Sequence, residues 1–163
     1  AIVDVTYSLQ NKEALARRRK PFFAANNLAV PATAFREIGG FDPRFLLPAG
    51  EDREFCDRWT ARGGGMIWAL EALVYHFNGL TLTSFWKQQF AYGRGAHRFH
   101  RTKGKRGAGP FRPDWELYWN ILCAFSCPTA RKRLRLFGLL VLSQVANGTG
   151  FLTEALNSRR SDD

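Results

Sequence analysis

Two adjacent carboxylates, Glu51 and Asp52, follow Gly50 and open a stretch whose pattern predicts an amphipathic helix. The strand-like apolar segment 67–75 comes next and ends at His76. A carboxylate can take the proton of a hydroxyl group as a general base, and carboxylates can share a hard divalent cation with a neutral imidazole. These residue types therefore suit general base or metal-assisted chemistry. The alternative for Asp52 is a carboxylate that only stabilises a helix start, by about 0.3–1 kcal/mol.

Local signals indicate the elements that must position these residues. Glycine readily adopts the left-handed conformation that ends a helix, so Gly39 predicts the end of a helix over 32–38. The helix that begins near Gly50 has acidic residues in its first turn, where the helix dipole favours carboxylates, and it ends at Gly63. The remaining patterns predict strands over 2–8 and 66–75, a helix over 84–98 with Ser84 as its N-cap, and an aromatic helix over 115–127.

The composition indicates one globular domain or part of one. The chain has 163 residues, 45% of them hydrophobic, and its 14 Phe and 5 Trp are too many for a disordered tail. Its 3 cysteines fit no paired disulfide framework, which favours a reducing compartment. Since the chain starts at Ala1 without an initiator Met or a signal region, we expect it to be a piece of a longer protein.

Charge is distributed unevenly along the chain, whose formal net charge is +10. Six of the 14 acidic residues lie between Glu37 and Asp57, whereas the segment 86–113 contains many basic residues and no acidic one. An acidic site is therefore expected beside a basic flank.

A second basic cluster, residues 131–135, directly precedes the apolar stretch 137–142. Each cation near an anionic bilayer contributes about 1 kcal/mol to binding, so this order is typical of a segment that lies on a membrane surface. We do not expect it to span the membrane, because Gln144, Asn147 and Thr149 interrupt a stretch already close to the minimum of about 17 residues. The alternative is a solvated basic helix beside a buried one.

Four motifs occur in order between about residues 20 and 100. They are Phe23-Ala24-Ala25-Asn26-Asn27-Leu28-Ala29-Val30-Pro31, Phe35-Arg36-Glu37-Ile38-Gly39-Gly40-Phe41-Asp42, Gly50-Glu51-Asp52-Arg53-Glu54-Phe55 and Ala72-Leu73-Val74-Tyr75-His76. Together they resemble the C-terminal half of family 2 glycosyltransferases of the GT-A fold. The resemblance implies an α/β fold class: the acceptor-side part of a Rossmann-like GT-A domain over residues 1–100. A basic loop and a helical, membrane-associating tail are expected over 101–163.

The resemblance implies roles in catalysis for three residues. Asp52 matches the catalytic base of inverting members, and Glu51 is its neighbour in an orienting role. His76 matches the histidine that helps to bind the metal ion or the donor diphosphate. The alternative for His76 is a histidine that only ends a strand.

Four further residues are implied to bind substrate. Asn27, Gly40 and Asp42 match positions that shape the donor and acceptor cleft. Arg94 is expected to contact a phosphate of either substrate, because guanidinium groups pair well with phosphate. The alternatives are an Asn27 that only bridges backbone groups in a turn and a solvent-exposed Arg94.

Departures from the family pattern limit what this chain is expected to do alone. No Asp-x-Asp motif occurs in the sequence, so these ligands of the Mn²⁺ or Mg²⁺ that the resemblance implies are missing. The half that binds the nucleotide has no counterpart either, and we expect the 163 residues by themselves to be inactive. Of the Gln-x-x-Arg-Trp motif of processive relatives, the chain keeps Gln89 alone, which favours a single transfer over polymer synthesis.

The resulting hypothesis is a fragment of an inverting glycosyltransferase that moves a sugar from a nucleotide-sugar donor to an acceptor hydroxyl. The acceptor is expected to be a lipid-linked or cell-envelope glycan. The expected location is the cytoplasmic face of a bacterial-type plasma membrane, with the C-terminal tail on an anionic surface and no nucleic acid partner. The alternative is a non-catalytic basic module in which 87–112 binds nucleic acid or an anionic membrane. A scaffold without chemistry is a third reading.

Overall fold

The computed structural model describes residues 22–45, 49–67, 69, 71–72, 74–75, 79–105 and 129–160. The elements in these ranges are the 3₁₀ helix η1 (Ala25–Asn27) and the α-helices α2 (Ala32–Glu37), α3 (Glu51–Ala61), α4 (Leu82–Lys105) and α6 (Ala130–Arg160). No strand occurs in the part of the chain that the structure describes. The predicted α/β fold class, with part of a Rossmann-like GT-A domain, is therefore wrong.

The segment 66–75, which the sequence predicts as a strand, shows why the predicted fold class is wrong. Its described residues form a turn and irregular structure, with the Ala72 N–H donating to the Ala69 carbonyl at 3.1 Å. The side chains of Ile67, Val74 and Tyr75 are largely exposed. Apolar alternation favours a strand only where a neighbouring strand and a core receive the side chains, and the described residues provide neither for these three. The strand predicted over 2–8 lies outside the described residues.

Helix α3 is confirmed where the sequence predicts it. Gly50 precedes the helix with φ of +88°, and Gly63 follows its end with φ of +82°, both in the left-handed region that favours glycine. Carboxylates occupy the first turn, where they stabilise the positive end of the helix dipole. Helix α2 likewise occupies the predicted range and ends before Gly39, whose φ is +88°.

Phe55 of α3 is the centre of a small aromatic core. Its ring lies 5.5 Å from the ring of Phe35, 5.2 Å from that of Phe41 and 6.2 Å from that of Trp59, measured between centroids. Phe55 is 1% exposed, and it is buried together with Ile38 and Cys56. This core fixes α3 against α2.

Helix α4 is longer than predicted and begins differently. The Ser84 N–H donates to Thr81 Oγ1 at 3.2 Å, and the Thr81 N–H donates to Ser84 Oγ at 2.8 Å. Thr81 is thus the N-cap in a reciprocal capping arrangement, and Ser84 lies within the first turn. The helix also continues through Lys103, where the sequence predicts a loop.

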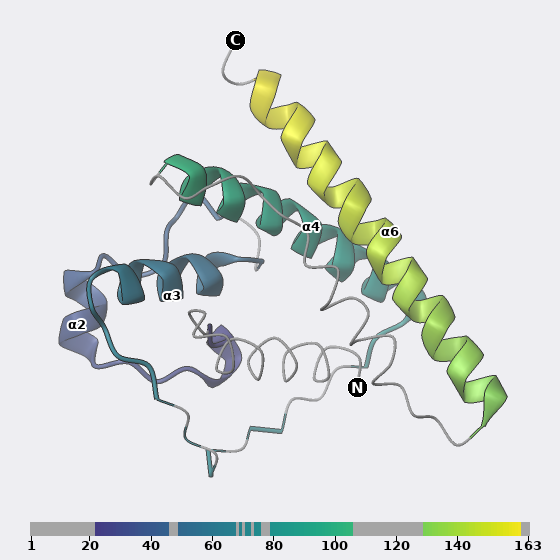
Figure 1. Ribbon diagram of the computed structural model, residues 1–163, viewed down its shortest axis with the longest axis horizontal. Helices are drawn as coiled ribbons and strands as arrows, with labels where there is room; N and C mark the ends of the chain where they lie inside the picture. The colour runs from purple at the N-terminus through teal and green to yellow at the C-terminus, as the bar shows by residue number, and fades with distance from the viewer. Residues whose placement is uncertain are drawn as a thin grey trace.

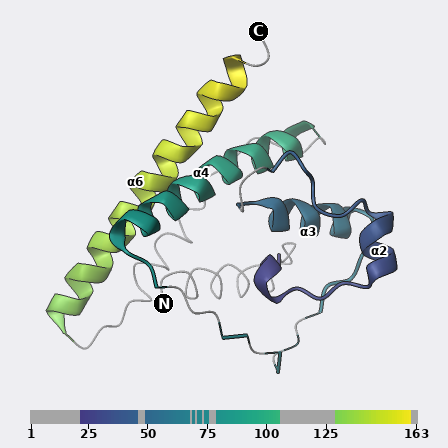
Figure 2. The same ribbon diagram turned by 180° about the vertical axis from the view of Figure 1, so that it is seen from behind.

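Helix α6 unites the basic cluster 131–135 and the apolar stretch 137–142 in one element of 31 residues. It is long and apolar enough to cross a membrane or to anchor the chain to one. In both views α6 crosses α4, and α3 lies on the other side of α4 with α2 beside it (Figures 1 and 2).

Small residues allow α6 to approach α4 closely. A Cβ on Gly93 would overlap the carbonyl oxygen of Asn147, and a Cβ on Gly150 would overlap that of Phe90. The Asn147 side chain donates to Gln89 Oε1 and to the Ser143 carbonyl, both at 2.9 Å. The polar residue that interrupts the apolar stretch therefore has its hydrogen bonds inside the helix pair.

Candidate functional site

The start of α3 packs directly against α4. A Cβ on Gly95 of α4 would overlap the carbonyl oxygen of Ala49, and a Cβ on Gly50 would lie 3.0 Å from the Gly95 carbonyl oxygen. Further along, Lys103 Nζ lies 3.5 Å from Asp57 Oδ1, so the two helices run in the same direction. This packing places Glu51 and Asp52 at the junction of the two helices.

Tyr92 of α4 faces these carboxylates. Burial raises the pKa of the Tyr92 phenol, and the negative charges of Asp52 and Glu51 raise it further. The phenol therefore lies within electrostatic reach of both acids and keeps its proton at neutral pH. A protonated phenol can donate a hydrogen bond to a carboxylate or to a bound ligand.

The surroundings of Glu51 disfavour the ionised form of its carboxyl group. Burial raises the pKa of its carboxyl group, and the adjacent negative charge of Asp52 acts in the same direction. Its Oε2 atom is buried and has no hydrogen-bond partner among the described residues. Such orphaned acceptors are rare in folded proteins, so each one calls for an explanation.

Gln88 provides a second buried acceptor of this kind. Its Oε1 atom is buried and has no hydrogen-bond partner within the described ranges. Gln88, Tyr92 and Gly95 are four and three residues apart, which places them on one face of α4. Because Gly95 packs on Ala49, this is the face toward the start of α3. The carboxylate pair thus has the Tyr92 phenol nearby, and Gln88 with its unsatisfied acceptor lies on the same face of α4 as Tyr92.

Asp52 is half-buried and has a single local hydrogen bond. Its Oδ1 atom accepts the Arg53 N–H at 2.7 Å. It lies in the first turn of α3, at the positive end of the helix dipole. An ionised carboxylate with one oxygen uncommitted among the described residues is equipped to accept a proton.

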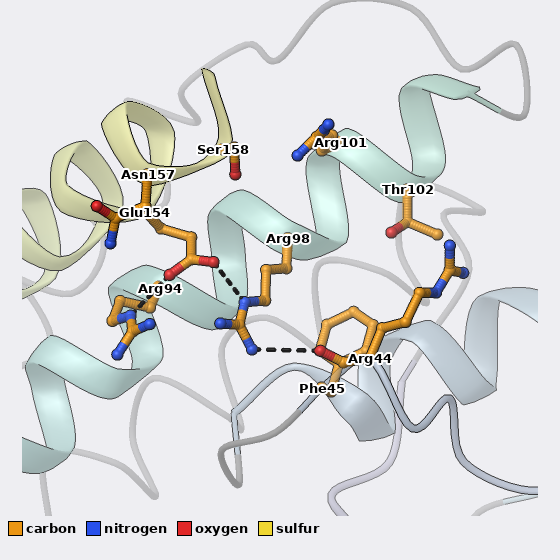
Figure 3. A pocket seen from close by; sticks show the side chains of 9 residues that line it. All are labelled: Arg44, Phe45, Arg94, Arg98, Arg101, Thr102, Glu154, Asn157 and Ser158. Carbon is orange, nitrogen blue, oxygen red and sulfur yellow. Dashed lines mark hydrogen bonds and ion pairs between the residues drawn. The ribbon is translucent and has the colours of Figure 1, made fainter. Parts of the chain in front are cut away.

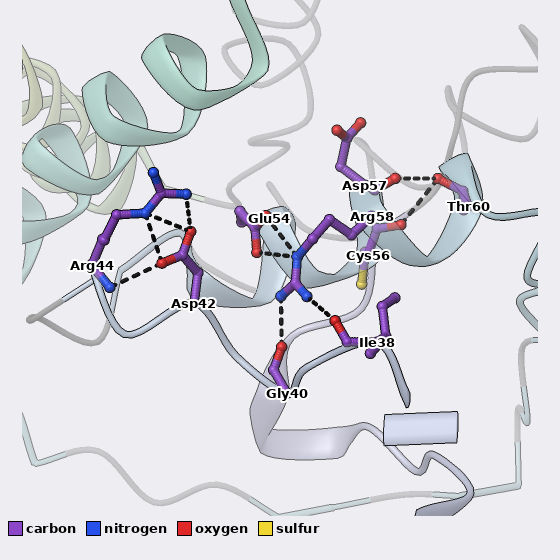
Figure 4. Close-up of polar contacts among 9 residues, drawn as sticks. All are labelled: Ile38, Gly40, Asp42, Arg44, Glu54, Cys56, Asp57, Arg58 and Thr60. Carbon is purple, nitrogen blue, oxygen red and sulfur yellow. Dashed lines mark hydrogen bonds and ion pairs between the residues drawn. The ribbon is translucent and has the colours of Figure 1, made fainter. Parts of the chain in front are cut away.

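The Gly40 and Asp42 turn has a structural role, as Figure 4 shows. The Gly40 carbonyl accepts a hydrogen bond from Arg58 Nη2 at 2.6 Å, and Arg58 also pairs with the fully buried Glu54 at 2.8 Å. The Asp42 carboxylate accepts the backbone N–H and the guanidinium of Arg44, and the hydrogen bond to that side chain lowers the Asp42 pKa. Both predicted substrate-binding residues are thus held in contacts within the fold.

Asn27 and Arg94 also have partners away from the carboxylate pair. The Asn27 side chain donates to the Ala72 carbonyl at 2.9 Å, so it ties η1 to the segment after α3. Arg94 Nε donates to Glu154 Oε2 of α6 at 2.7 Å, and the Arg94 side chain is 28% exposed. No hydrogen bond or ion pair joins Asn27, Asp42 or Arg94 to Glu51 or Asp52 in the described part of the chain.

His76, the predicted metal ligand, lies outside the described residues. Among the residues that the structure describes, no group of three or more His, Cys, Asp and Glu side chains is placed to hold a metal ion. Glu51 and Asp52 alone do not make up the ligand set that Mg²⁺ or Mn²⁺ requires.

Sequence reasoning missed Tyr92 as a neighbour of the acids and Gln88 on the same face of α4. It assigned the glutamine of the family motif to Gln89, which faces α6 instead. One signal was available. Gly93 and Gly95 lie inside an otherwise helical pattern, and a glycine there usually has a packing reason. The two glycines lie on different faces of α4: Gly93 packs against α6, and Gly95 packs against Ala49, just before α3.

Comparison of the chain with family models, with curated proteins and with solved structures finds no match. A function is therefore inferred from the residues and their geometry.

Proposed function

We propose that this chain supplies the acceptor side of an inverting glycosyltransferase in which Asp52 is the general base. One observation carries this function: two adjacent carboxylates at the start of α3 lie against α4 near the Tyr92 phenol, and one of them, Glu51, has a buried oxygen without a hydrogen-bond partner among the described residues. A sugar acceptor offers several hydroxyl donors, which match unsatisfied acceptor atoms. The four ordered motifs around Asp52 point to the same class of reaction.

In the proposed reaction, an acceptor hydroxyl attacks the anomeric carbon of a nucleotide sugar. The new carbon–oxygen bond forms while the bond to the nucleoside diphosphate breaks, and the diphosphate leaves with the electron pair. Asp52 takes the proton of the attacking hydroxyl, a contribution of about 10²–10⁴-fold for a positioned base. One carboxylate is sufficient here, unlike in glycoside hydrolysis, which needs two on opposite sides of the bond.

Glu51, Gln88 and Tyr92 orient the acceptor in this proposal. Glu51 Oε2 and Gln88 Oε1 accept hydroxyl hydrogens of the sugar, and the Tyr92 phenol donates to it. Satisfying buried acceptors only when the correct ligand binds gives strong discrimination against analogues that lack the hydroxyl. The nucleotide, and a divalent cation that neutralises the leaving diphosphate, bind outside the described residues.

The long helix α6 supports a place on a membrane. Its exposed apolar side chains recur mostly at intervals of three or four residues and form one stripe, which consists of Leu134, Phe137, Val141, Val145, Leu152 and Leu156. The buried residues of α6, among them Leu140 and Ala146, lie on the opposite face against α4.

Exposed cations lie around the first residue of this stripe and complement an anionic bilayer; they are Arg131, Lys132, Arg133 and Arg135. We therefore place the stripe of α6 in the surface of an anionic membrane, as a peripheral anchor at the cytoplasmic face of a bacterial-type plasma membrane. A lipid-linked or cell-envelope glycan is then the acceptor that lies within reach.

The stereochemistry of transfer tests the proposed reaction. The protein that contains this chain together with a nucleotide-binding part is incubated with nucleotide sugars and lipid-linked acceptors, and the product anomer is assigned by NMR. Inversion relative to the donor is expected. The 163 residues alone are expected to give no product. Retention of configuration, or turnover by the isolated chain, contradicts the proposal.

A further inference from the structure

A pocket of about 510 Å³ lies beside α4, on a face next to the one that packs on the start of α3. It is bounded by the loop around Arg44, by the C-terminal half of α4 and by the last turns of α6 (Figure 3). Its volume falls in the range of about 300–1,000 Å³ that is usual for sites that bind small molecules. Neither the aromatic core nor the carboxylate pair contributes to its lining.

The lining of the pocket is strongly cationic. Arg94, Arg98 and Arg101 are four and three residues apart on one face of α4, and Arg44 faces them from the loop before α3. Glu154 is the one acidic residue in the lining. The Arg44 guanidinium is paired with Asp42, but the three guanidinium groups of α4 around Glu154 still leave an excess of positive charge, which attracts an anion.

Glu154 fixes the positions of Arg94 and Arg98 and neutralises only one of their two positive charges. It is 7% exposed and accepts Arg94 Nε at 2.7 Å and Arg98 Nε at 2.6 Å. Each of these ion pairs uses the Nε–H of its arginine. A guanidinium has five N–H donors, so Arg94 and Arg98 each keep other N–H groups, whose direction the ion pair fixes. Arg98 Nη1 also donates to the Arg44 carbonyl at 3.3 Å, which ties the loop to α4.

Neutral hydrogen-bonding groups complete the lining. Thr102 of α4 and Asn157 and Ser158 of α6 border the pocket. Hydroxyl and amide groups donate to the oxygens of a phosphate but do not discriminate by charge. Planar guanidinium groups bind phosphate through paired N–H donors, which makes arginine the residue of choice for this ligand.

We propose that this pocket binds a phosphate monoester or diphosphate group. Its size accommodates more than inorganic phosphate, and its position between α4 and the membrane-directed α6 allows two sources for the group: the headgroup of an anionic lipid or a soluble phosphorylated compound. The site does not depend on sugar transfer, so it can be tested without any assay of activity.

The test is calorimetric titration of the complete chain with inorganic pyrophosphate. We expect saturable binding that Arg101→Gln weakens about tenfold, the effect of losing one charge-assisted hydrogen bond. The matched control Arg133→Gln removes the same charge from the opposite end of α6 and is expected to leave the affinity unchanged. Thr102→Val, which removes a hydroxyl without changing charge, is expected to weaken binding less, and circular dichroism verifies that each variant folds.

Competition identifies the source of the phosphate group. Vesicles that contain phosphatidic acid, a phosphate monoester, are expected to displace pyrophosphate if the ligand is a lipid headgroup, whereas vesicles of phosphatidylserine serve as a charge control. Binding of pyrophosphate without displacement assigns the site to a soluble ligand. The inference is overturned if pyrophosphate does not bind, or if Arg133→Gln weakens pyrophosphate binding as much as Arg101→Gln.

Discussion

Glu51 and Asp52 place two negative charges side by side at the half-buried start of a helix. The helix dipole stabilises carboxylates there, but the burial of Glu51 and the charge of Asp52 raise the pKa of Glu51. A raised carboxyl pKa means that the folded state favours the protonated form. Ionisation of Glu51 therefore reduces stability, and this cost is consistent with an acid that is retained for a ligand and not for the fold.

The first residue-scale prediction concerns pH. The stabilisation that protonated Glu51 provides is fully present below its usual pKa of 4.5 and is lost as pH rises through the raised pKa of the folded state. Relative to Glu51→Gln, the wild type is expected to lose melting temperature as pH rises above about 4.5. Thermal unfolding from pH 4 to pH 8 measures the difference. Glu37→Gln, at an exposed position of α2, is the control, and wild-type and Glu51→Gln curves that stay parallel contradict the electrostatic account.

The second residue-scale prediction concerns the pair that joins α3 to the end of α2. Arg58 binds the buried Glu54 and two carbonyl groups, so Arg58→Ala removes a cation from a buried carboxylate and two hydrogen bonds from the carbonyl groups. Breaking a buried ion pair from one side costs about 3–5 kcal/mol, and we expect the free energy of unfolding in urea to fall by about that amount. Arg62→Ala, which removes an exposed arginine from the same end of the core, is expected to change it by about 0.5 kcal/mol or less. Equal effects of the two substitutions contradict the structural role of Arg58.

At the residue scale, the sequence was informative about Asp52 and less so about its neighbours. The acidic first turn after Gly50 is a local signal, and it correctly placed Glu51 and Asp52 at a helix start. The approach of Gln88 and Tyr92 depends on how α4 packs on α3, a contact between distant parts of the chain that no local pattern encodes. For the same reason the sequence did not predict the hydrogen bonds of Asn27 to Ala72 and of Arg94 to Glu154.

At the element scale, helices were predictable wherever several local signals agreed. Helix α3 has an acidic start, an apolar face and a glycine end, and it formed over the expected range. The strand over 66–75 rested on alternation alone, and Val74 and Tyr75 instead are exposed. A strand needs a partner from elsewhere in the chain, so its prediction from one segment is intrinsically weaker than that of a helix.

Two glycines near the crossing of α4 and α6 give an element-scale prediction: alanine at one position is expected to destabilise the protein, and alanine at the other to stabilise it. A Cβ on Gly93 would overlap the Asn147 carbonyl oxygen, so Gly93→Ala must separate the helices and is expected to cost about 1–3 kcal/mol of stability. Gly148 lies on α6 two residues from Gly150, and a Cβ there meets nothing within 4 Å. Gly148→Ala is therefore expected to stabilise the protein by about 0.5–1 kcal/mol, because alanine favours a helix interior. Chemical denaturation measures both, and a stabilising Gly93→Ala contradicts the close packing.

At the scale of the whole molecule, α4 carries the carboxylate junction on one side and α6 on another, so the proposed acceptor site and the membrane stripe are held by one helix (Figure 1). The sequence predicted the basic and apolar parts of this tail. It did not predict that both belong to a single helix whose polar residues bond to α4, because those bonds are tertiary.

Membrane association is the prediction at this scale. The chain is expected to sediment with anionic vesicles and not with neutral ones. Replacing Phe137 and Val141 together by Ser is expected to weaken partitioning about tenfold or more, because each apolar side chain loses its burial in lipid. Ile67→Ser is the control, since Ile67 is 88% exposed and lies outside α6. Binding to oligonucleotides instead of anionic vesicles contradicts this account and favours a nucleic acid module.

The central claim, that Asp52 is the general base of a sugar transfer, is tested most directly by the turnover number of Asp52→Asn in the protein that contains the nucleotide-binding part. Asparagine preserves size and the hydrogen bond from the Arg53 N–H but cannot take a proton. Asp57→Asn, on the same helix beside Lys103, is the matched control. We predict that Asp52→Asn lowers kcat by about 10²–10⁴-fold with an unchanged melting temperature and an active control; transfer by Asp52→Asn at the wild-type rate contradicts the claim.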